Sequence, residues 1–145
     1  MLLNKFIKKK EWNLTKTILP QHTDHAGVMW HGSYLNFLEE ARIDALNKVG
    51  MSYSELSKQG FEIPVISITI KYRKSFFHGE TFLLMSQFNL ENKIRLNCKT
   101  VFLKSNGDIG AEAKIGLIVA RRRNESIKLV RELPGEIKNI LLLLE

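Results

Sequence analysis

The chain has one cysteine, three prolines and no long apolar run among its 145 residues, and each shortage excludes a class of protein. Cys98 alone forms neither an intramolecular disulfide nor a zinc site with several cysteines, which is typical of a reduced, cytoplasmic setting. No stretch reaches the roughly 18–20 apolar residues of a membrane-spanning helix, so we expect no membrane partner. The N-terminus has too short an apolar run for a signal peptide, and its lysines follow that run instead of preceding it.

What remains is the composition of a globular domain. Hydrophobic residues make up 44% and charged residues 26% of the chain, which excludes a disordered protein, and the length is sufficient for a real core. We therefore predict a single domain over residues 1–145, with a flexible basic arm at 1–11 and a C-terminal helix or tail at 134–145.

The stretch from Tyr34 to Val49 has the apolar spacing of an amphipathic helix. Apolar residues recur there every three or four positions, and polar residues fall between them. Ser33 is the predicted N-cap, and Gly50 is predicted to end the helix. A second, short helix with capping-box spacing is predicted over Met51–Gly60. The apolar stripe of the long helix consists of Tyr34, Phe37, Leu38, Ala41, Ala45, Leu46 and Val49.

Five segments are predicted to be strands, and all of them except Thr81–Phe88 have apolar residues at alternate positions. The clearest has Ile66, Ile68, Ile70 and Tyr72 on one face, which we expect to be buried, and polar residues on the other. An Asn-Gly pair at 106–107 is a strong hairpin signal between the last two segments. The predicted strands are Trp12–Leu19, Ile63–Lys74, Thr81–Phe88, Lys93–Lys104 and Ile109–Arg121.

This order of elements predicts an α+β fold. The last four strands are expected to form a long antiparallel meander with one apolar face, and the long helix is the only element able to cover that face. The result is an antiparallel sheet of about five strands wrapped around one central helix. Such a sheet leaves an open edge.

The loop ahead of the long helix carries the chemistry. Asp24 and His31 stand in a polar segment that also contains Gly27 and Gly32, immediately before the helix N-terminus. A helix N-terminus has unpaired N–H groups and about half a positive charge, so it can hold an anion or a developing oxyanion. An acid–base group beside such donors is the minimum needed for acyl transfer.

These residues resemble a known family. The segments Asp24–Val28, His31–Tyr34 and Glu39–Arg42 are similar to the D-x-A-G-V, W-H-G-x-Y-L and E-E-A-R patterns of hotdog-fold acyl-CoA thioesterases of the 4-hydroxybenzoyl-CoA thioesterase type. The resemblance is densest from Asp24 to Arg42 and extends more loosely to about Arg123. It implies the same sheet-around-helix fold, no cofactor, and pairing of open sheet edges into a homodimer, which in this family often pairs further into a tetramer.

The resemblance also implies roles for the loop residues. Asp24 would activate the attacking water as a general base, or attack the thioester carbonyl itself and form a transient anhydride. The backbone N–H of His31 would be the oxyanion donor, with Gly27 and Gly32 shaping the loop. The structural alternatives stay open: Asp24 as the former of an Asx-turn, and His31 as a loop histidine packed on Trp30.

Substrate contacts are implied in the same way. Tyr34 and Phe61 would lie against the acyl group. The basic strand ends would meet the phosphates of coenzyme A, since charge-assisted contacts to phosphate suit arginine and lysine. The alternative for either cluster is a solvated strand end. The basic residues concerned are Arg73, Lys74, Arg121, Arg122 and Arg123.

The net charge of +7 leaves the anionic partner open at this point. Acyl-CoA is the expected partner, and an acidic acyl-carrier protein is a further candidate. A basic nucleic-acid-binding protein is an alternative, although the chain has no recognisable nucleic-acid motif, so we expect no nucleic acid. A non-catalytic acyl-CoA or acyl-carrier binding module and an acyl-CoA hydratase of the same fold are the other rivals.

Two further chemistries have weak support in the sequence. His22, Asp24, His25 and His31 could bind zinc, but they have no H-E-x-x-H spacing, so we expect no metal. Ser33 lacks the G-x-S-x-G context of a serine nucleophile.

Cys98 falls on an apolar strand face, and we predict it to be a small core residue.

Overall fold

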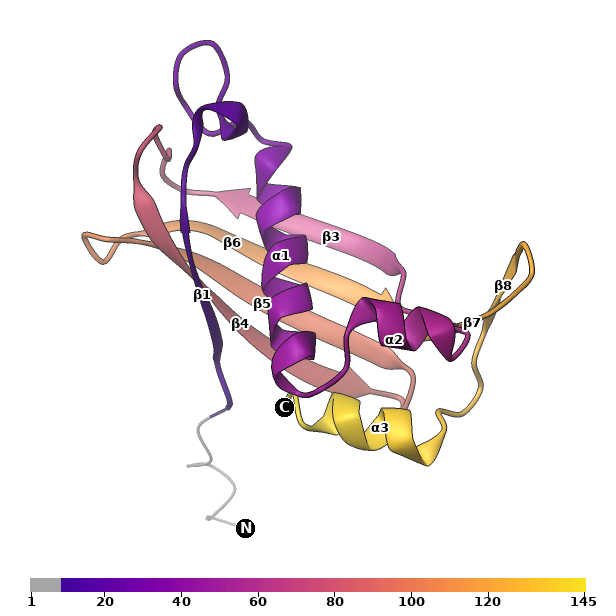
Figure 1. The fold of residues 1–145 in the computed structure, drawn as a ribbon. Coiled ribbons are helices and arrows are strands. Elements are labelled where there is room, and N and C mark those ends of the chain that lie inside the picture. The colour runs from indigo at the N-terminus through magenta and orange to yellow at the C-terminus, as the bar shows by residue number, and fades with distance from the viewer. Residues whose placement is uncertain (1–8) are drawn as a thin grey trace, which may run out of the picture.

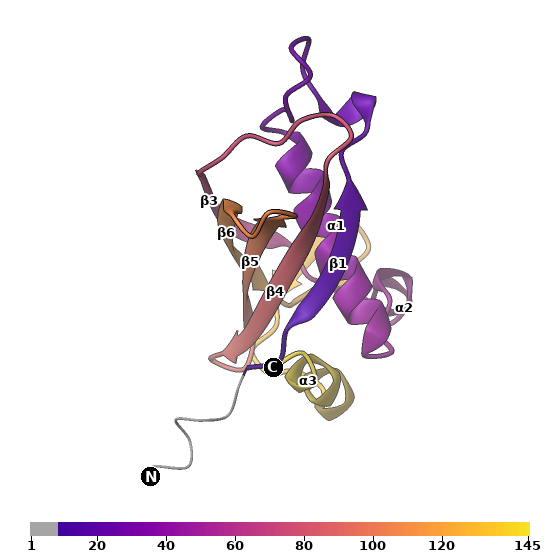
Figure 2. The ribbon, with the colours of Figure 1, turned by 90° about the vertical axis from the view of Figure 1, so that its left-hand side faces the viewer.

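The computed structural model describes residues 9–145, which form a five-stranded antiparallel sheet curved around one long helix (Figures 1 and 2). The hotdog architecture expected from the sequence is confirmed. Most of the predicted arm at 1–11 lies outside the described residues. The elements are β1 (Trp12–Thr17), the 3-10 helix η2 (Pro20–His22), α1 (Ser33–Lys48), α2 (Tyr53–Lys58), β2 (Phe61–Glu62), β3 (Val65–Tyr72), β4 (Thr81–Glu91), β5 (Arg95–Lys104), β6 (Ile109–Ile118), β7 (Ala120–Arg123), β8 (Ser126–Leu129) and α3 (Gly135–Leu142).

Helix α1 has the predicted stripe on its buried face. Tyr34, Phe37 and Leu46 are at most 4% exposed. Gly50 ends the helix with a φ of 86°, a conformation that a residue with a Cβ adopts only at a cost. The predicted N-cap is wrong: Gly32 is the cap, Ser33 is the first helical residue, and the Ser33 hydroxyl instead donates to the His22 carbonyl at 2.8 Å. The local cap is exchanged for a bond that ties the helix to the preceding loop.

The sheet order is β1-β4-β5-β6-β3, which corrects the predicted meander of four strands. Only β4, β5 and β6 follow one another, while β3 pairs with β6 and lies at the edge opposite β1. Helix α1 lies across the middle of the sheet (Figure 1). Strand β1, which precedes α1 in the sequence, and β3, which follows it, lie at opposite edges.

A second, three-stranded sheet of order β2-β7-β8 was not expected. The last predicted strand, Ile109–Arg121, ends at Ile118, and the chain then forms the β7–β8 hairpin with Asn124 at a φ of 53° in the turn. Asparagine tolerates this left-handed conformation, so Asn124 was the available turn signal. Three consecutive arginines, Arg121, Arg122 and Arg123, follow β6 closely in sequence, and this run hid the alternation of the next strands.

The core between α1 and the sheet is aromatic. The ring centroids of Phe37 and Phe82 are 5.1 Å apart, and those of Phe76 and Phe82 are 5.0 Å apart. Phe102 stacks on Phe82 at 5.8 Å. Cys98 is buried, as predicted, and burial raises the pKa of its thiol despite a hydrogen-bond contact with Thr100. The packed phenylalanine rings stabilise the end of the sheet nearest the loop before α1.

Gly110 makes room for this cluster, and Gly110→Ala tests the packing. A Cβ at Gly110 would overlap the Phe76 ring, and the Gly110 carbonyl accepts from the N–H groups of Arg73 and Lys74 at 2.9 and 3.0 Å. We expect the substitution to lower the free energy of unfolding by about 1–3 kcal/mol, the usual cost of overpacking, in urea denaturation. Gly135→Ala is the control, because a Cβ there meets nothing within 4 Å. Equal stability of the two variants would contradict the packing argument.

Strand β3 exposes the face that we expected it to bury. Ile66, Ile68 and Tyr72 are 50%, 41% and 54% exposed, and only Ile70 is half-buried. The alternation was predicted correctly, but β3 is an edge strand and the rest of the chain does not cover its apolar face. The opposite edge, β1, exposes polar residues such as Asn13 and Thr15. The two edges therefore differ in chemistry.

Within residues 9–145, no helix is long and apolar enough to cross a membrane.

Candidate functional site

The loop between β1 and α1 is a tight hairpin. Thr23 and Met29 form an antiparallel bridge, and the Asp24 N–H donates to the Val28 carbonyl at 2.8 Å. Gly27 has a φ of 76° at the tip, where a side chain would strain the turn. A second bridge joins Val28 to Phe77, and the Met29 N–H donates to the Phe76 carbonyl at 2.7 Å. The hairpin is therefore held by the connection between β3 and β4.

Asp24 is an exposed residue that forms an Asx-turn with one carboxylate oxygen. Its Oδ1 accepts from the N–H groups of Ala26 at 2.8 Å and Val28 at 3.2 Å. The other oxygen has no hydrogen-bond partner among residues 9–145. The turn-forming interpretation thus describes one oxygen, and the second oxygen remains available for chemistry.

Two N–H groups at the start of α1 are free within the described chain. The backbone N–H groups of His31 and Gly32 donate to no acceptor in residues 9–145, although those of Trp30 and Ser33 do. They precede a helix of 16 residues, whose dipole adds positive potential at this point. The His31 ring lies 4.9 Å from Trp30, as the structural alternative expected, and the Trp30 ring occupies the space beside Gly32.

A hollow of about 260 Å³ has His31 in its lining, whereas Gly32 is not part of it. Tyr34 lines the hollow with its ring 4.9 Å from that of Tyr72, and burial together with the neighbouring Tyr72 raises the pKa of Tyr34 to about 12. The phenol therefore stays protonated and can donate a hydrogen bond. Asp24 and Phe61 are not part of this hollow. Its lining consists of Val28, Met29, His31, Tyr34, Tyr72, Arg73, Lys74 and Ser75.

The basic end of β3 is already paired. Arg73 donates to Glu112 through Nε and Nη2 at 2.8 and 2.6 Å, and Lys74 donates to Asp108 at 2.9 Å. These cations lower the pKa of both carboxyls. Arg73 and Lys74 lie beside the hollow, as the sequence led us to expect, but each has a carboxylate partner that a phosphate would have to displace.

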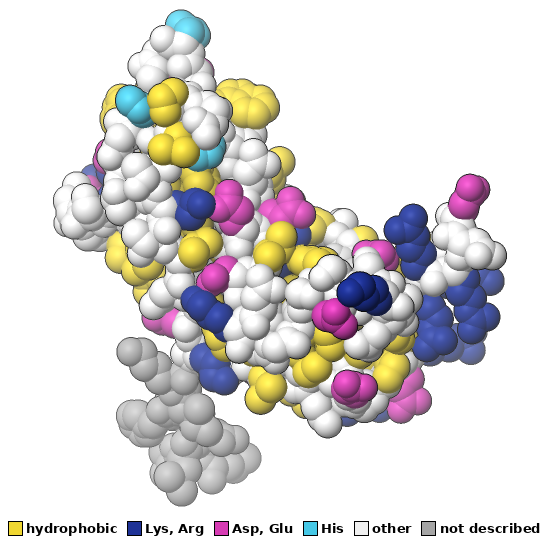
Figure 3. All heavy atoms as spheres, viewed as in Figure 1, with side chains coloured by type: hydrophobic (Ala, Val, Ile, Leu, Met, Phe, Trp, Pro, Cys, Tyr) yellow, Lys and Arg dark blue, Asp and Glu magenta, His cyan; other side chains and the backbone are white. Residues whose placement is uncertain are grey.

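The arginines of β7 lie elsewhere. Arg121 packs over the ring of Phe61 at 5.1 Å, and Phe61 is only 5% exposed. Arg122 approaches Glu62 at 3.6 Å. The β7–β8 hairpin carries many basic side chains and projects from the body of the protein. It lies at a different end of the molecule from the histidine-bearing loop (Figure 3). Within one chain, the structure does not bring Phe61 and the arginines to Asp24.

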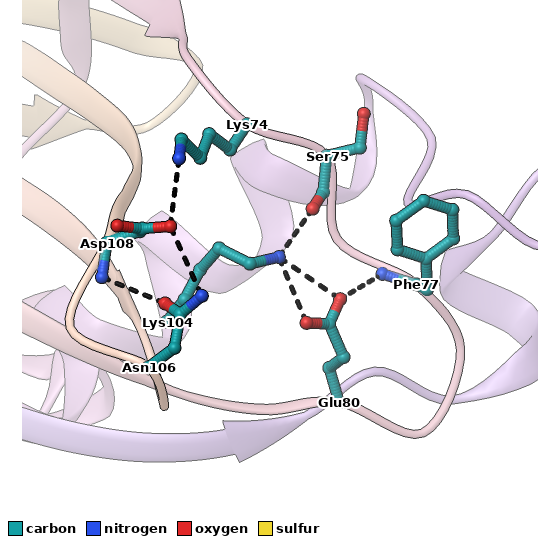
Figure 4. Close-up of polar contacts among 7 residues, drawn as sticks. All are labelled: Lys74, Ser75, Phe77, Glu80, Lys104, Asn106 and Asp108. Atoms are coloured by element: carbon teal, nitrogen blue, oxygen red, sulfur yellow. Dashed lines mark hydrogen bonds and ion pairs between the residues drawn. The ribbon is translucent and has the colours of Figure 1, made fainter.

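One positioning network was missed in the sequence. Lys104 bridges the β3–β4 connection by donating to the Ser75 carbonyl and pairing with Glu80 at 3.0 Å, and Glu80 also accepts from the Phe77 N–H (Figure 4). The Lys104 Nζ also lies 4.4 Å from the centre of the Phe76 ring. This connection holds the Asp24 hairpin, so Lys104 and Glu80 position the site. No motif marks them, because they are 24 residues apart and meet only in the fold.

Glu80→Gln should make the site connection less stable in a pH-dependent way. Burial raises the pKa of Glu80, but the hydrogen bonds from Phe77 and Lys104 and the Lys104 charge outweigh it, so the pKa lies below its ordinary value. A lowered folded-state pKa gives stability that is present above the unfolded-state pKa and is lost as pH falls through the folded-state pKa. At pH 7 we expect the free energy of unfolding of the wild type to exceed that of the variant by about 1 kcal/mol, after allowance for solvent exposure. This difference should decrease towards pH 3.

The measurement is urea unfolding at both pH values. Glutamine still accepts from the Phe77 N–H, so the comparison isolates the ion pair. Glu136→Gln on α3, which is exposed, is the control. A difference that grows as the pH falls would contradict this role for Glu80.

The zinc alternative gains no support, since residues 9–145 contain no group of three or more metal-ligating side chains placed to hold an ion.

Comparisons with known proteins agree with this architecture. A model of the thioesterase-like superfamily matches residues 18–139. The Synechocystis protein sll0410, named provisionally as an esterase, is 30% identical over 137 residues, which are 94% of this chain and 81% of that protein.

Solved structures of low identity share the fold. The 1,4-dihydroxy-2-naphthoyl-CoA thioesterase Slr0204 of Synechocystis superposes with a TM-score of 0.82 at 17% identity, over 92% of this chain and 96% of that one. The DHNA-CoA thioesterase of Staphylococcus aureus superposes with a TM-score of 0.80 at 23% identity, over 90% and 87%. The expectation of a thioester hydrolase is confirmed at the level of the family. On the family match and the identity to the Synechocystis protein, the chain belongs to the thioesterase-like superfamily.

Proposed function

We propose that the protein is an acyl-CoA thioesterase that hydrolyses a thioester to a carboxylic acid and free coenzyme A. The observation that carries the proposal is that one loop contains both a half-satisfied carboxylate and free N–H groups at the start of a helix. Asp24 has one oxygen fixed by backbone and one without a partner, and the unpaired N–H groups of His31 and Gly32 follow at the start of α1. This arrangement supplies a base or nucleophile and an oxyanion site.

The reaction needs only these groups and water. As a general base, Asp24 takes a proton from water, whose oxygen attacks the thioester carbonyl, and the C–S bond breaks as the thiolate leaves. As a nucleophile, Asp24 forms a mixed anhydride with release of the thiolate, and water then hydrolyses the anhydride. In both routes the carbonyl oxygen becomes negative, and the N–H of His31, with Gly32 beside it, stabilises that charge. One such donor contributes about a hundred- to a thousandfold in rate.

The proposed enzyme is a homodimer paired through β3. An edge strand with exposed Ile66, Ile68 and Tyr72 offers both free backbone groups and apolar surface to a second copy. The polar β1 edge offers no such surface. Antiparallel pairing of two β3 strands about a two-fold axis would continue the sheet across both chains.

This pairing would also complete the site. Strand β3 has eight residues and therefore spans about 25 Å. An antiparallel partner places the Val65 end of its β3 beside the Tyr72 end of the first. The Val65 end adjoins β2 and β7, so Phe61 and Arg121 of the second copy would approach the loop of the first. Phe61, Arg121, Arg122 and Arg123 would then serve the acyl group and the coenzyme A phosphates in trans.

The acyl specificity follows from the aromatic wall of the hollow. Tyr34 and Tyr72 lie edge to face, and both line the hollow together with His31. The similar structures include thioesterases of 1,4-dihydroxy-2-naphthoyl-CoA and gentisyl-CoA, both aromatic acyl groups. We therefore place aromatic acyl-CoAs first, ahead of short and medium aliphatic acyl-CoAs and acyl-carrier-protein thioesters.

A thiol-release assay on purified protein tests the proposal. The panel contains an aromatic, a short and a medium aliphatic acyl-CoA, and an acyl-carrier-protein thioester. We expect turnover of at least one coenzyme A ester, fastest with the aromatic one. Tight binding of acyl-CoA without thiol release would favour a non-catalytic binding module instead.

A further inference from the structure

The face of the sheet that α1 does not cover, here called the outer face, carries a continuous polar array. Strand register places Gln87, Lys99, Lys114 and Thr69 side by side across β4, β5, β6 and β3. Residues directly opposite one another in paired strands point to the same face. Their sequence neighbours, such as Cys98 and Ile115, are buried on the face that α1 covers. The thioesterase proposal uses none of the residues of this array.

Lys99 and Lys114 are directly opposite each other on paired strands. Their Cβ atoms are therefore about 5 Å apart, and like charges at that separation destabilise a sheet. Among residues 9–145, no carboxylate lies within ion-pair distance of either lysine. The nearest acidic position in the array, Glu112, already accepts two hydrogen bonds from Arg73. The pair is an uncompensated positive site in the protein alone.

A hollow lies beside the two lysines, and its lining includes Gly116 of the next row. Gly116 stands between Asn97 and Ser67, and a Cβ there would overlap the Ser67 hydroxyl and approach a guanidinium nitrogen of Arg95 to 3.4 Å. The hollow has a volume of about 300 Å³, at the low end of small-molecule sites. Its polar lining consists of Lys9, Ser67, Thr69, Gln87, Asn89, Asn97, Lys99 and Lys114.

The donors fit one kind of ligand. Ammonium groups, hydroxyls and amide N–H groups together offer several hydrogen bonds to an oxyanion, and two adjacent lysines match a double negative charge. A concave site of this volume suits a compact ligand better than an extended polymer. Glu112 has its pKa lowered mainly by Arg73, with Lys99 and Lys71 adding to the effect, which agrees with a positive potential over this face.

We propose that the hollow over Gly116 binds the phosphate group of a small phosphomonoester, held by Lys99 and Lys114 with Ser67, Thr69 and Asn97 as further donors. The site is separate from the Asp24 loop and does not depend on thioester hydrolysis. It also explains why the repulsive lysine pair is present: the bound dianion removes the repulsion.

The experiment is a titration of isotope-labelled full-length protein, followed by amide NMR shifts, with inorganic phosphate, adenosine 5′-monophosphate and neutral adenosine as separate probes. We expect saturable shifts at Asn97, Lys99 and Gly116 with both phosphates and none with adenosine. Tighter binding of the nucleotide than of inorganic phosphate would identify a phosphomonoester as the ligand. Equal affinity would assign free phosphate to the site, and binding of neither would overturn the proposal.

Matched variants separate this site from general positive charge. Lys99→Gln and Lys114→Gln should each weaken phosphate binding by about tenfold, while Lys58→Gln, which removes the same charge from α2, should not. Without ligand, Lys99→Gln should raise Tm by about 1–3 °C through relief of the lysine pair. An equal loss of phosphate affinity in all three variants would overturn the proposal. Steeply salt-dependent binding of a single-stranded oligonucleotide, without binding of adenosine 5′-monophosphate, would overturn it as well.

Discussion

Asp24→Asn is expected to lower kcat/KM for the preferred acyl-CoA by about a thousandfold and to leave the fold unchanged. The turn survives because an amide oxygen at this position still accepts from the N–H groups of Ala26 and Val28. What is lost is the second carboxylate oxygen, which has no structural partner in the described chain. An amide is neither a base nor a nucleophile at neutral pH, so the substitution removes the chemical step alone. The measurement is steady-state thiol release.

The control for this prediction is Asp44→Asn. Asp44 lies on α1 and pairs with Lys48 at 2.7 Å, so the variant removes the same charge without touching the loop. It should keep wild-type kcat/KM. Full activity of Asp24→Asn would exclude Asp24 as base and nucleophile while leaving the family assignment intact.

Isotope labelling tests whether Asp24 forms an anhydride that water cleaves at the enzyme carbonyl. Turnover in H₂¹⁸O followed by mass analysis of the loop peptide shows whether label enters the Asp24 carboxylate. Label in Asp24 indicates a mixed anhydride cleaved at the enzyme carbonyl, because a general base exchanges protons and no oxygen atoms with water.

The sequence predicted those parts of the fold that depend on local periodicity. The stripe that begins at Tyr34 placed α1 within one residue, and Gly50 and Gly60 ended both helices as expected, since each needs a positive φ that the sequence displays as glycine. Strand alternation in β5 and β6 was read correctly for the same reason.

Strand partners could not be predicted in this way. Alternation tells which face a residue occupies and carries no information about which strand lies alongside, so β3 was placed next to β4 and lies next to β6. The burial of Ile68 was overestimated because an isoleucine on an edge strand that its own chain leaves uncovered has the same sequence pattern as one on a covered strand. The Asp24 loop was proposed as the site because of its motif, whereas Lys104 and Glu80 became visible only once the fold brought them together.

Ile68→Lys should convert the proposed dimer to monomers and remove most of the thioesterase activity. The midpoint of β3 falls at Ile68 and Thr69, so in an antiparallel pair the two copies of residue 68 lie close to the two-fold axis. Two lysines there would face each other on a surface that is apolar in the wild type. Like charges at an interface cost several kcal/mol, so we expect the dimer to weaken by at least about a hundredfold.

Sedimentation velocity at micromolar concentration, with activity measured on the same samples, tests this prediction. Leu142→Lys is the matched control, because Leu142 is also 41% exposed but lies on α3, far from β3 in the sequence. It should remain dimeric and active. If the monomeric Ile68→Lys protein regains specific activity as its concentration rises, the loss of activity arises from dissociation. The reason is that a higher protein concentration shifts the equilibrium towards the dimer and does not change the activity of the monomer. A dimeric Ile68→Lys protein would exclude β3 as the interface, and an active monomer would show that the arginines of β7 do not act in trans.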